Sequence, residues 1–407
     1  YQALADYHQA IEYHQKSLAI ASEIGNRKGE ENALDNLGSA YGSMGNYHQA
    51  IEYHQNSLAI AREIGDRNGE GISLGNLGVI YQGLGNYPLA INYQKQSLAI
   101  AREIGDRFGE VTSIENISMI YFFLGDYHQA IYYSQQGLAI TREIGDRYVE
   151  AAALGNLGNA YQALGNYIQA LEYYQQHLTI KREISDKRGE GTALGNLGLV
   201  YQELGDYDQA IDYYRQHLRI AKEISNRKGE ECALENLGNI YYFLGDYSQA
   251  IEYQQQSLTI AKEMGDQMGE GTSLGNLGNA YMCLEDYSQA FEYYQQSLTV
   301  AQKIGDLYGE VAAMTNLGNN LMLIKQYPES LKCLQAALEL VRKIGYRSAE
   351  AITLHKLAIL HLILYDLELA CEYCDRALVI ATELGIPLAR ECQELQKELR
   401  SQVDILH

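Results

Sequence analysis

Asparagine is the residue whose spacing in this sequence points most directly to binding chemistry. One asparagine recurs every 40 residues, as Asn36, Asn76, Asn116, Asn156, Asn196, Asn236, Asn276 and Asn316. A second, partial row follows three residues later, as Asn159, Asn239, Asn279 and Asn319. Because an amide side chain both donates and accepts hydrogen bonds, it can pair with the main chain of an extended peptide, whatever side chains that peptide carries. The two rows therefore predict a peptide-binding surface.

The residues beside these rows would set the specificity of such a surface. Acids stand beside the rows at Asp35, Glu115, Glu203 and Glu235. Aromatic residues follow them at Phe123 and Tyr242. Basic residues are scarce at these positions, so the predicted partner is an extended segment with Lys or Arg among apolar residues. The glycines beside the row would leave space for its main chain, at Gly75, Gly155, Gly195 and Gly275.

Both features also have a purely structural interpretation. In that interpretation the asparagines only bridge adjacent helices or hold water, and the charges only face solvent. A recurrent arginine is likewise open to two interpretations, an exposed ion pair with a nearby acid or contact with an acidic ligand. It stands at Arg27, Arg67, Arg107, Arg147, Arg227 and Arg347. The sequence leaves these alternatives open.

Side chains of the kind that enzymes and metal sites use form no recognisable motif in this sequence. It contains neither GxxxxGK[ST] nor HExxH. Cys371 and Cys374 form a CxxC without a second pair at metal spacing, so they are interpreted as small core residues. Histidines at equivalent positions of neighbouring repeats are interpreted as packed side chains; these are His14 with His54 and His177 with His217. We therefore predict no enzyme activity, no metal and no cofactor.

The elements that must position these residues can be predicted from residues 149–185. Apolar residues at helical spacing form one stripe of a first helix, at Leu154, Leu157, Tyr161 and Leu164. Gly165 and Asn166 are typical of a helix C-cap followed by an N-cap. A longer second helix follows, with its inner stripe at Tyr167, Ala170, Leu171, Tyr174, Leu178 and Ile184. The small residues Gly158 and Ala170 should let the two helices approach closely.

Length and composition agree with an array of such helix pairs. The chain has 407 residues, and a 40-residue period runs through most of it, which is typical of a solenoid. Only three prolines interrupt it. The formal net charge of −21 argues against nucleic acid or an anionic membrane as partner, because both need a basic patch. The six cysteines show no disulfide spacing, which favours a cytoplasmic setting. The predicted fold class is all-α, an α-solenoid of antiparallel helix pairs.

The repeated pattern resembles the tetratricopeptide repeat. The resemblance rests on Leu154-x-x-Leu157-Gly158-x-x-Tyr161, then Ala170 and Tyr174, and on the connector Gly65-Asp66-Arg67-Asn68-Gly69-Glu70. The 40-residue unit is similar to the long-helix repeats of kinesin light chain, of spindle-orientation adaptors with GoLoco motifs and of bacterial, especially cyanobacterial, arrays. The resemblance implies a right-handed superhelix with the asparagines in its concave groove, where peptide-binding relatives hold ligand backbones. The family's clamp for a peptide C-terminal carboxylate needs Lys or Arg there, which this chain does not supply.

Two functions follow from this resemblance. The first is a scaffold that holds an extended protein segment in the groove through the asparagine ladder. The second is the sensor or regulatory region of a larger signalling protein with an ATPase or caspase-like protease module. The predicted segments are a truncated first repeat over 1–28, eight repeats over 29–345, a divergent ninth over 346–386 and a capping helix over 387–407. The uncapped first helix also suggests self-association.

Overall fold

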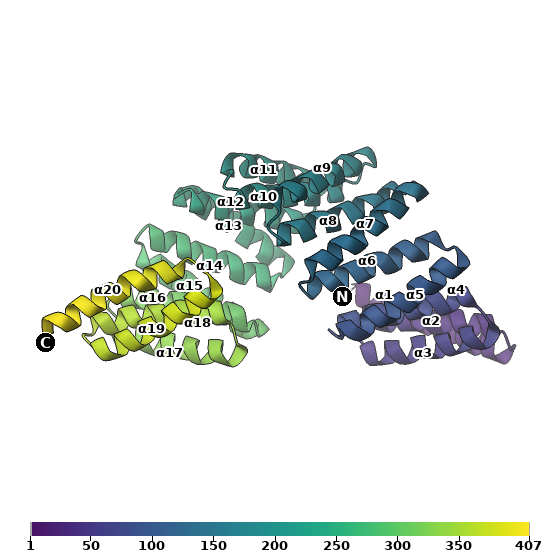
Figure 1. The fold of residues 1–407 in the computed structure, drawn as a ribbon, viewed down its shortest axis with the longest axis horizontal. Helices are drawn as coiled ribbons and strands as arrows, with labels where there is room; N and C mark the ends of the chain where they lie inside the picture. The colour runs from purple at the N-terminus through teal and green to yellow at the C-terminus, as the bar shows by residue number, and fades with distance from the viewer. Residues whose placement is uncertain (1, 407) are drawn as a thin grey trace. The chain divides into compact units, whose positions relative to one another are not determined.

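The fold of the chain was analysed in a computed structural model that describes residues 2–406, and the side chains of residues 7–402. Over the described residues it consists of twenty α-helices and no strand, which confirms the all-α prediction. The helices form two compact units, residues 1–205 and 206–407. In each unit, successive helices pack side by side (Figure 1). The predicted segment boundaries stay a prediction, and residues 1 and 407, which limit them, lie outside the described residues.

The first unit contains ten helices. They are α1 (Gln2–Glu23), α2 (Arg27–Ser43), α3 (Tyr47–Ile64), α4 (Arg67–Gly83), α5 (Tyr87–Ile104), α6 (Arg107–Phe123), α7 (Tyr127–Ile144), α8 (Arg147–Ala163), α9 (Tyr167–Glu183) and α10 (Lys187–Glu203). In this unit the even-numbered helices from α2 to α10 are the first helices of the repeats and carry the asparagine rows.

The second unit also contains ten helices. They are α11 (Tyr207–Glu223), α12 (Arg227–Phe243), α13 (Tyr247–Met264), α14 (Gln267–Cys283), α15 (Tyr287–Ile304), α16 (Leu307–Leu323), α17 (Tyr327–Ile344), α18 (Arg347–Ile363), α19 (Leu367–Leu384) and α20 (Leu388–Leu406). The last helix packs on α18 and α19.

The turns between helices follow the predicted capping chemistry. Gly165 adopts a left-handed φ of 73° after α8, and the side chain of Asn166 accepts a hydrogen bond from the Gln169 N–H. After α9 the left-handed position is taken by Ser185, with a φ of 58°, and Asp186 caps α10 by accepting from the Gly189 N–H. A short polar turn thus stops one helix and starts the next.

The predicted apolar stripe forms the core, with one exception. Leu154 and Leu157 of α8 are fully buried, as are Ala170 and Tyr174 of α9. Leu164 is instead 38% exposed. It is the C-cap residue of α8, and the chain turns away from the helix directly after it, at Gly165. Leu164 thus continues the apolar stripe by its spacing but is not part of the core.

The two helices of each pair approach most closely at one position of the first helix. At Gly38, Gly78, Gly238, Gly278 and Gly318, a Cβ atom would lie 2.5–2.7 Å from a side chain sixteen residues later. The residue there is large, such as His54 opposite Gly38. In α6 the glycine is replaced by Ser118, and its partner is the small Ser134, whose Oγ lies 2.6 Å away. A large side chain thus occurs opposite glycine, and a small one occurs where the glycine is replaced, as close packing requires.

The recurrent arginines form ion pairs within their own repeat, as one of the two interpretations predicted. Arg147 contacts Glu150 at the start of α8 and Glu183 at the end of α9. The same arrangement recurs for Arg27, Arg67, Arg107, Arg227 and Arg347. Each arginine therefore links the start of the first helix of its repeat to the end of the second helix. These ion pairs lie at the surface, where a single ion pair contributes little stability.

Candidate peptide-binding surface

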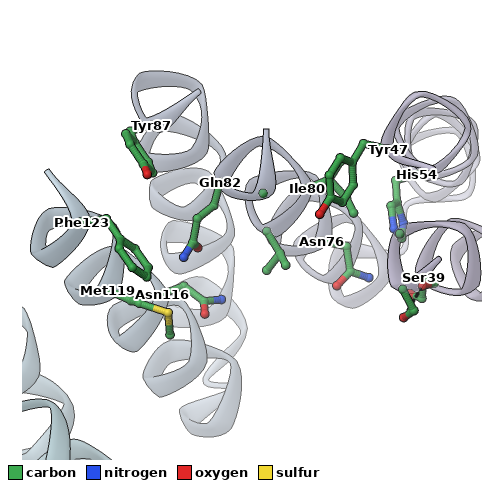
Figure 2. A pocket seen from close by; sticks show the side chains of 14 residues that line it. Ser39, Tyr47, His54, Asn76, Ile80, Gln82, Tyr87, Asn116, Met119 and Phe123 are labelled. Carbon is green, nitrogen blue, oxygen red and sulfur yellow. Dashed lines mark hydrogen bonds between the residues drawn. The ribbon is translucent and has the colours of Figure 1, made fainter. Parts of the chain in front are cut away.

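The first unit has a pocket of about 650 Å³ on the side where the first helices α2, α4 and α6 lie in a row. Figure 2 shows Asn116, Met119 and Phe123 of α6 on one side of it, with Asn76 and Gln82 of α4 nearer its middle. Ser39, Tyr47 and His54 close the opposite side (Figure 2). Two of the predicted ladder residues therefore line one pocket, together with one predicted aromatic residue.

Asn76 is held in this pocket by the preceding repeat. Its Nδ2 donates to both carboxylate oxygens of Asp35, at 3.1 Å each. Asp35 also lies 2.8 Å from Nδ1 of the buried His54. Because a carboxylate only accepts hydrogen bonds, the amide must turn its NH₂ group toward Asp35. The Oδ1 of Asn76 has no hydrogen-bond partner among the described residues.

Three other asparagines of the main row are bridged in the same way. Asn156 donates to Glu115 at 2.6 Å. Asn276 donates to Asn239 at 3.1 Å, and Asn316 donates to Asn279 at 3.3 Å. The acceptor belongs to the preceding repeat each time, so the ladder links neighbouring first helices. This is the structural role that the sequence left as an alternative, and it uses only one side of each amide.

The second row mainly contacts the second helix of its own repeat. Asn159 accepts a hydrogen bond from the Tyr174 hydroxyl at 2.6 Å, and Asn279 accepts one from Tyr294 at 2.8 Å. Asn239 accepts from the Gln254 amide at 2.9 Å. These residues therefore fix a buried side chain of the second helix.

The remaining asparagines are not bridged. Asn36 is exposed, and four others are partly exposed without a side-chain hydrogen bond among the described residues; these are Asn116, Asn196, Asn236 and Asn319. For Asn116 the reason is local, because the preceding repeat has Gly75 and Val79 where other repeats carry an acceptor. The ladder thus contains both amides fixed by protein and amides without a side-chain hydrogen bond among the described residues.

The predicted specificity residues lie in different environments. Burial raises the pKa of Glu115 to about 7, and the hydrogen bond from Asn156 only partly offsets this. Burial also raises the pKa of Glu235. Glu203 is exposed and accepts from the Tyr167 hydroxyl at 3.5 Å. The acids at 115 and 235 are therefore not simply solvated charges.

The two predicted aromatic residues also differ. Phe123 is 57% exposed at the edge of the pocket in Figure 2. Tyr242 is partly buried, and its hydroxyl lies 3.5 Å from Sγ of Cys283. Only Phe123 presents a large apolar surface to a ligand.

The sequence suggested that the glycines beside the ladder leave space for a ligand. The structure shows this for some of them and not for others. At Gly155 an added Cβ would lie 3.3 Å from the imidazole of His177, which fills that place. Burial lowers the pKa of His177 to about 4, so it packs as a neutral ring. Gly75 and Gly275, in contrast, border two small pockets of about 230 and 240 Å³. The sequence predicted space beside these two glycines, but not the extent of the pockets.

The small pockets arise where three small residues coincide. In the first unit these are Gly71, Gly75 and Ser97. In the second unit they are Gly271, Gly275 and Ser297. In other repeats at least one of the three equivalent positions holds a larger side chain, such as His177. The small residues themselves can be seen in the sequence, but only the packing of the two helices brings them together at one place.

The cysteine and histidine positions form no candidate metal centre in the described part of the chain. Cys374 is fully buried, and its thiol donates to the Cys392 carbonyl. Burial raises the pKa of this thiol to about 12, so it stays protonated. Over the same residues, none of the helices combines the length and apolar character that crossing a membrane requires.

Comparison with known families decides what kind of array this is. The sequence profile of the tetratricopeptide repeat matches residues 1–63, 29–103, 69–143, 110–183, 149–223, 229–303 and 310–383. The chain belongs to the tetratricopeptide repeat family. These repeats account for most of the sequence, and no catalytic domain is evident among the residues that the structure describes. Arrays of this kind generally serve as protein-binding scaffolds.

Solved structures support the same fold. The tetratricopeptide array is similar to a Signal Transduction ATPase with Numerous Domains protein from Pyrococcus horikoshii that has a tetratricopeptide repeat sensor (TM-score 0.63, 17% identity, 91% of this chain, 55% of that chain). It is also similar to the apo quorum sensor NprR from B. thuringiensis (TM-score 0.59, 17% identity, 89% of this chain, 99% of that chain). A third similar structure is BtubC from P. vanneervenii (TM-score 0.50, 19% identity, 54% of this chain, 92% of that chain). No curated protein matches the sequence.

Proposed function

We propose that this chain is a protein-binding scaffold that holds an extended segment of its partner along the first helices, with the asparagine ladder binding the segment's main chain. The observation that carries the proposal is the state of Asn76. Its Nδ2 is fixed by Asp35, and its Oδ1 has no partner among the described residues. An amide oriented in advance can accept a main-chain N–H without losing further side-chain freedom.

The pocket around Asn76 supports this proposal. It also contains Asn116, whose amide makes no hydrogen bond among the described residues and can both donate and accept. Met119 and Phe123 add exposed apolar surface beside these amides. Polar groups that bind a main chain, next to apolar surface that binds side chains, are what recognition of an extended peptide requires.

The charge of the chain favours a basic partner. With a formal net charge of −21, the protein attracts segments that carry Lys or Arg and repels nucleic acid and anionic membranes. All six cysteines are free thiols, which suits the cytoplasm. A second function, the sensor region of a larger bacterial signalling protein, would use the same surface. The fold likeness to the sensor-bearing ATPase is compatible with it.

Selection of peptides from a random linear library tests the scaffold function. We expect enriched peptides to bind the chain and to lose about tenfold or more in affinity when Asn76→Ala and Asn116→Ala are combined. Gln55→Ala with Asn56→Ala is the matched control, since both residues are exposed on α3 away from the pocket. Equal loss in both double variants, with helical circular dichroism retained, would contradict binding at the ladder.

A further inference from the structure

We propose that the two small pockets beside Gly75 and Gly275 are receptors for lysine side chains, each with an aspartate that binds the ammonium group. The aspartates are Asp106 and Asp306, the N-cap residues of α6 and α16. The inference rests on the proposed function in one respect, that the lysines belong to the bound segment. The pockets themselves follow from the packing of each unit.

Three other repeats already place a lysine against the equivalent aspartate. Lys28 donates to Asp66 and to Glu31, the latter at 2.9 Å. Lys228 donates to Asp266 and Glu231, at 2.7 Å each. In both clusters the glutamate is buried, with 2% or less of its surface exposed. A lysine, a buried glutamate and the capping aspartate thus fill the space between three helices.

In the repeats with pockets, two residues of this cluster, the lysine and the glutamate, are replaced by other residues. Forty residues after Lys28 and Glu31 stand Asn68 and Gly71, and forty after Lys228 and Glu231 stand Met268 and Gly271. The capping aspartate is kept. Each pocket therefore lies where the other repeats hold a buried glutamate and a lysine whose side chain is 47% or 56% exposed.

A third lysine reaches the aspartate from a different helix. Lys181 of α9 lies 2.9 Å from Oδ2 of Asp186 and stacks 4.2 Å from the ring centre of Tyr148. Its aliphatic chain takes the place that alanine occupies at Ala101 and Ala301 in the repeats with pockets. Ammonium binding by the capping carboxylate therefore does not depend on one direction of approach.

The carboxylates in the pockets keep one oxygen available. Oδ1 of Asp106 accepts from the Gly109 N–H at 3.0 Å, and Oδ1 of Asp306 accepts from the Gly309 N–H at 3.0 Å. Neither Oδ2 has a hydrogen-bond partner among the described residues. Part of the lining is apolar, with Ile100 and Ile104 in the first pocket, and part is polar, with side chains such as Thr112. A lysine can lay its alkyl chain on such a wall and extend its ammonium to the acid.

The position and size of the pockets fit a side chain from a bound segment. Asn76, Val79 and Asn116 line both the larger pocket of Figure 2 and the small pocket beside Gly75. Asn276 and Asn316 of the asparagine ladder line the small pocket beside Gly275. At about 230 and 240 Å³ both are smaller than pockets for drug-sized ligands, which measure roughly 300–1,000 Å³. Each suits one side chain.

Titration with a lysine analogue tests this inference directly. The probe is Nα-acetyl-lysine N-methylamide, and the neutral control is the norleucine analogue of equal length. In protein with labelled isoleucine methyl groups, we expect the lysine probe to shift the resonances of Ile104 and Ile304, which line the two pockets. The norleucine probe should bind about tenfold more weakly, because it cannot pair with the carboxylate.

Two sets of variants separate charge from packing. Asp106→Asn with Asp306→Asn removes the charge but keeps a good helix cap, as Asn226 shows in α12. This variant should bind the lysine probe no better than the norleucine probe. Asn68→Lys with Gly71→Glu rebuilds the cluster of Lys28 and Glu31 in the first pocket, so only the Ile104 shift should disappear. Unchanged lysine binding in either variant would overturn the proposal.

The results distinguish this inference from the scaffold function. If library peptides bind through Asn76 and Asn116 but show no preference for lysine, and the probe shifts neither isoleucine, the pockets are not lysine receptors and the scaffold stands. If the probe binds as expected while no peptide is enriched, the pockets stand and the ladder function fails.

Discussion

The ring of Tyr174 lies directly over Gly158, so that a Cβ atom added at 158 would be only 2.5 Å from Cε1 of the ring. Tyr174 is completely buried, and its hydroxyl lies 2.6 Å from Asn159 Oδ1 and 2.9 Å from Gln162 Oε1, so that either oxygen can accept its hydrogen. A glycine in the middle of a helix costs roughly 1 kcal/mol against alanine. Here it makes room for a large side chain of the second helix, whose burial offsets that cost.

We therefore expect Gly158→Ala to destabilise the protein by about 1–3 kcal/mol, although alanine is the better helix former. The added methyl group would force the Tyr174 ring off its position. Urea unfolding followed by circular dichroism measures the effect. Gly275→Ala is the matched control, because its added Cβ would lie 3.7 Å from Ser297 Oγ, an ordinary contact. That variant should be neutral or more stable, and an equal loss in both would refute the packing argument.

The pair Ser118 and Ser134 predicts a compensated exchange. Ser134→Tyr alone should destabilise the first unit, because the Ser118 side chain occupies the space where Gly158 receives a ring. Adding Ser118→Gly should restore most of the loss and give a coupling free energy of about 1–3 kcal/mol in a double-mutant cycle. Independent, additive effects of the two changes would show that the pair does not share one volume.

The buried carboxyl of Glu115 predicts a pH dependence of stability. Its pKa is raised from the ordinary 4.5 to about 7, so the folded state binds the proton more tightly than the unfolded state. The stabilising contribution of the protonated form is therefore present below pH 4.5 and is lost as the pH rises through 7. Glu115→Gln should remove this dependence and stabilise the protein above pH 7 by on the order of 2 kcal/mol.

Unfolding measured at several pH values between 4 and 8 checks this expectation. Glu203→Gln serves as the control, since it makes the same chemical change at an exposed position. If Glu115→Gln has the same profile as the native chain, Glu115 titrates normally and the expectation fails.

The cluster of Lys28, Glu31 and Asp66 should be sensitive to loss of its cation. Lys28→Met leaves Glu31 buried without a positive partner, which we expect to cost about 2 kcal/mol. Combining it with Glu31→Gln should recover part of that loss, since the remaining group is neutral. Thermal melts of both variants at neutral pH measure this, and a single variant as stable as the double would rule out a role for the ion pair.

The sequence predicted the helix pairs and the repeat because these depend on local patterns. Gly165 with Asn166 and the buried Leu154 and Leu157 follow from capping and periodicity within a few dozen residues. Helical spacing alone does not show that Leu164, at the end of the same stripe, is 38% exposed. The match to the tetratricopeptide repeat followed from the same local patterns.

The sequence by itself determined that the chain is an array of antiparallel helix pairs with asparagine rows, because apolar period, small residues and caps act within one repeat. Only the tertiary structure decided what those asparagines contact. Asn76 is bridged to Asp35 and Asn116 is free, since the acceptor comes from another repeat about 40 residues earlier. The same holds for the pocket beside Gly75, which depends on three side chains from two helices being small at once. Such coincidences arise only when helices pack.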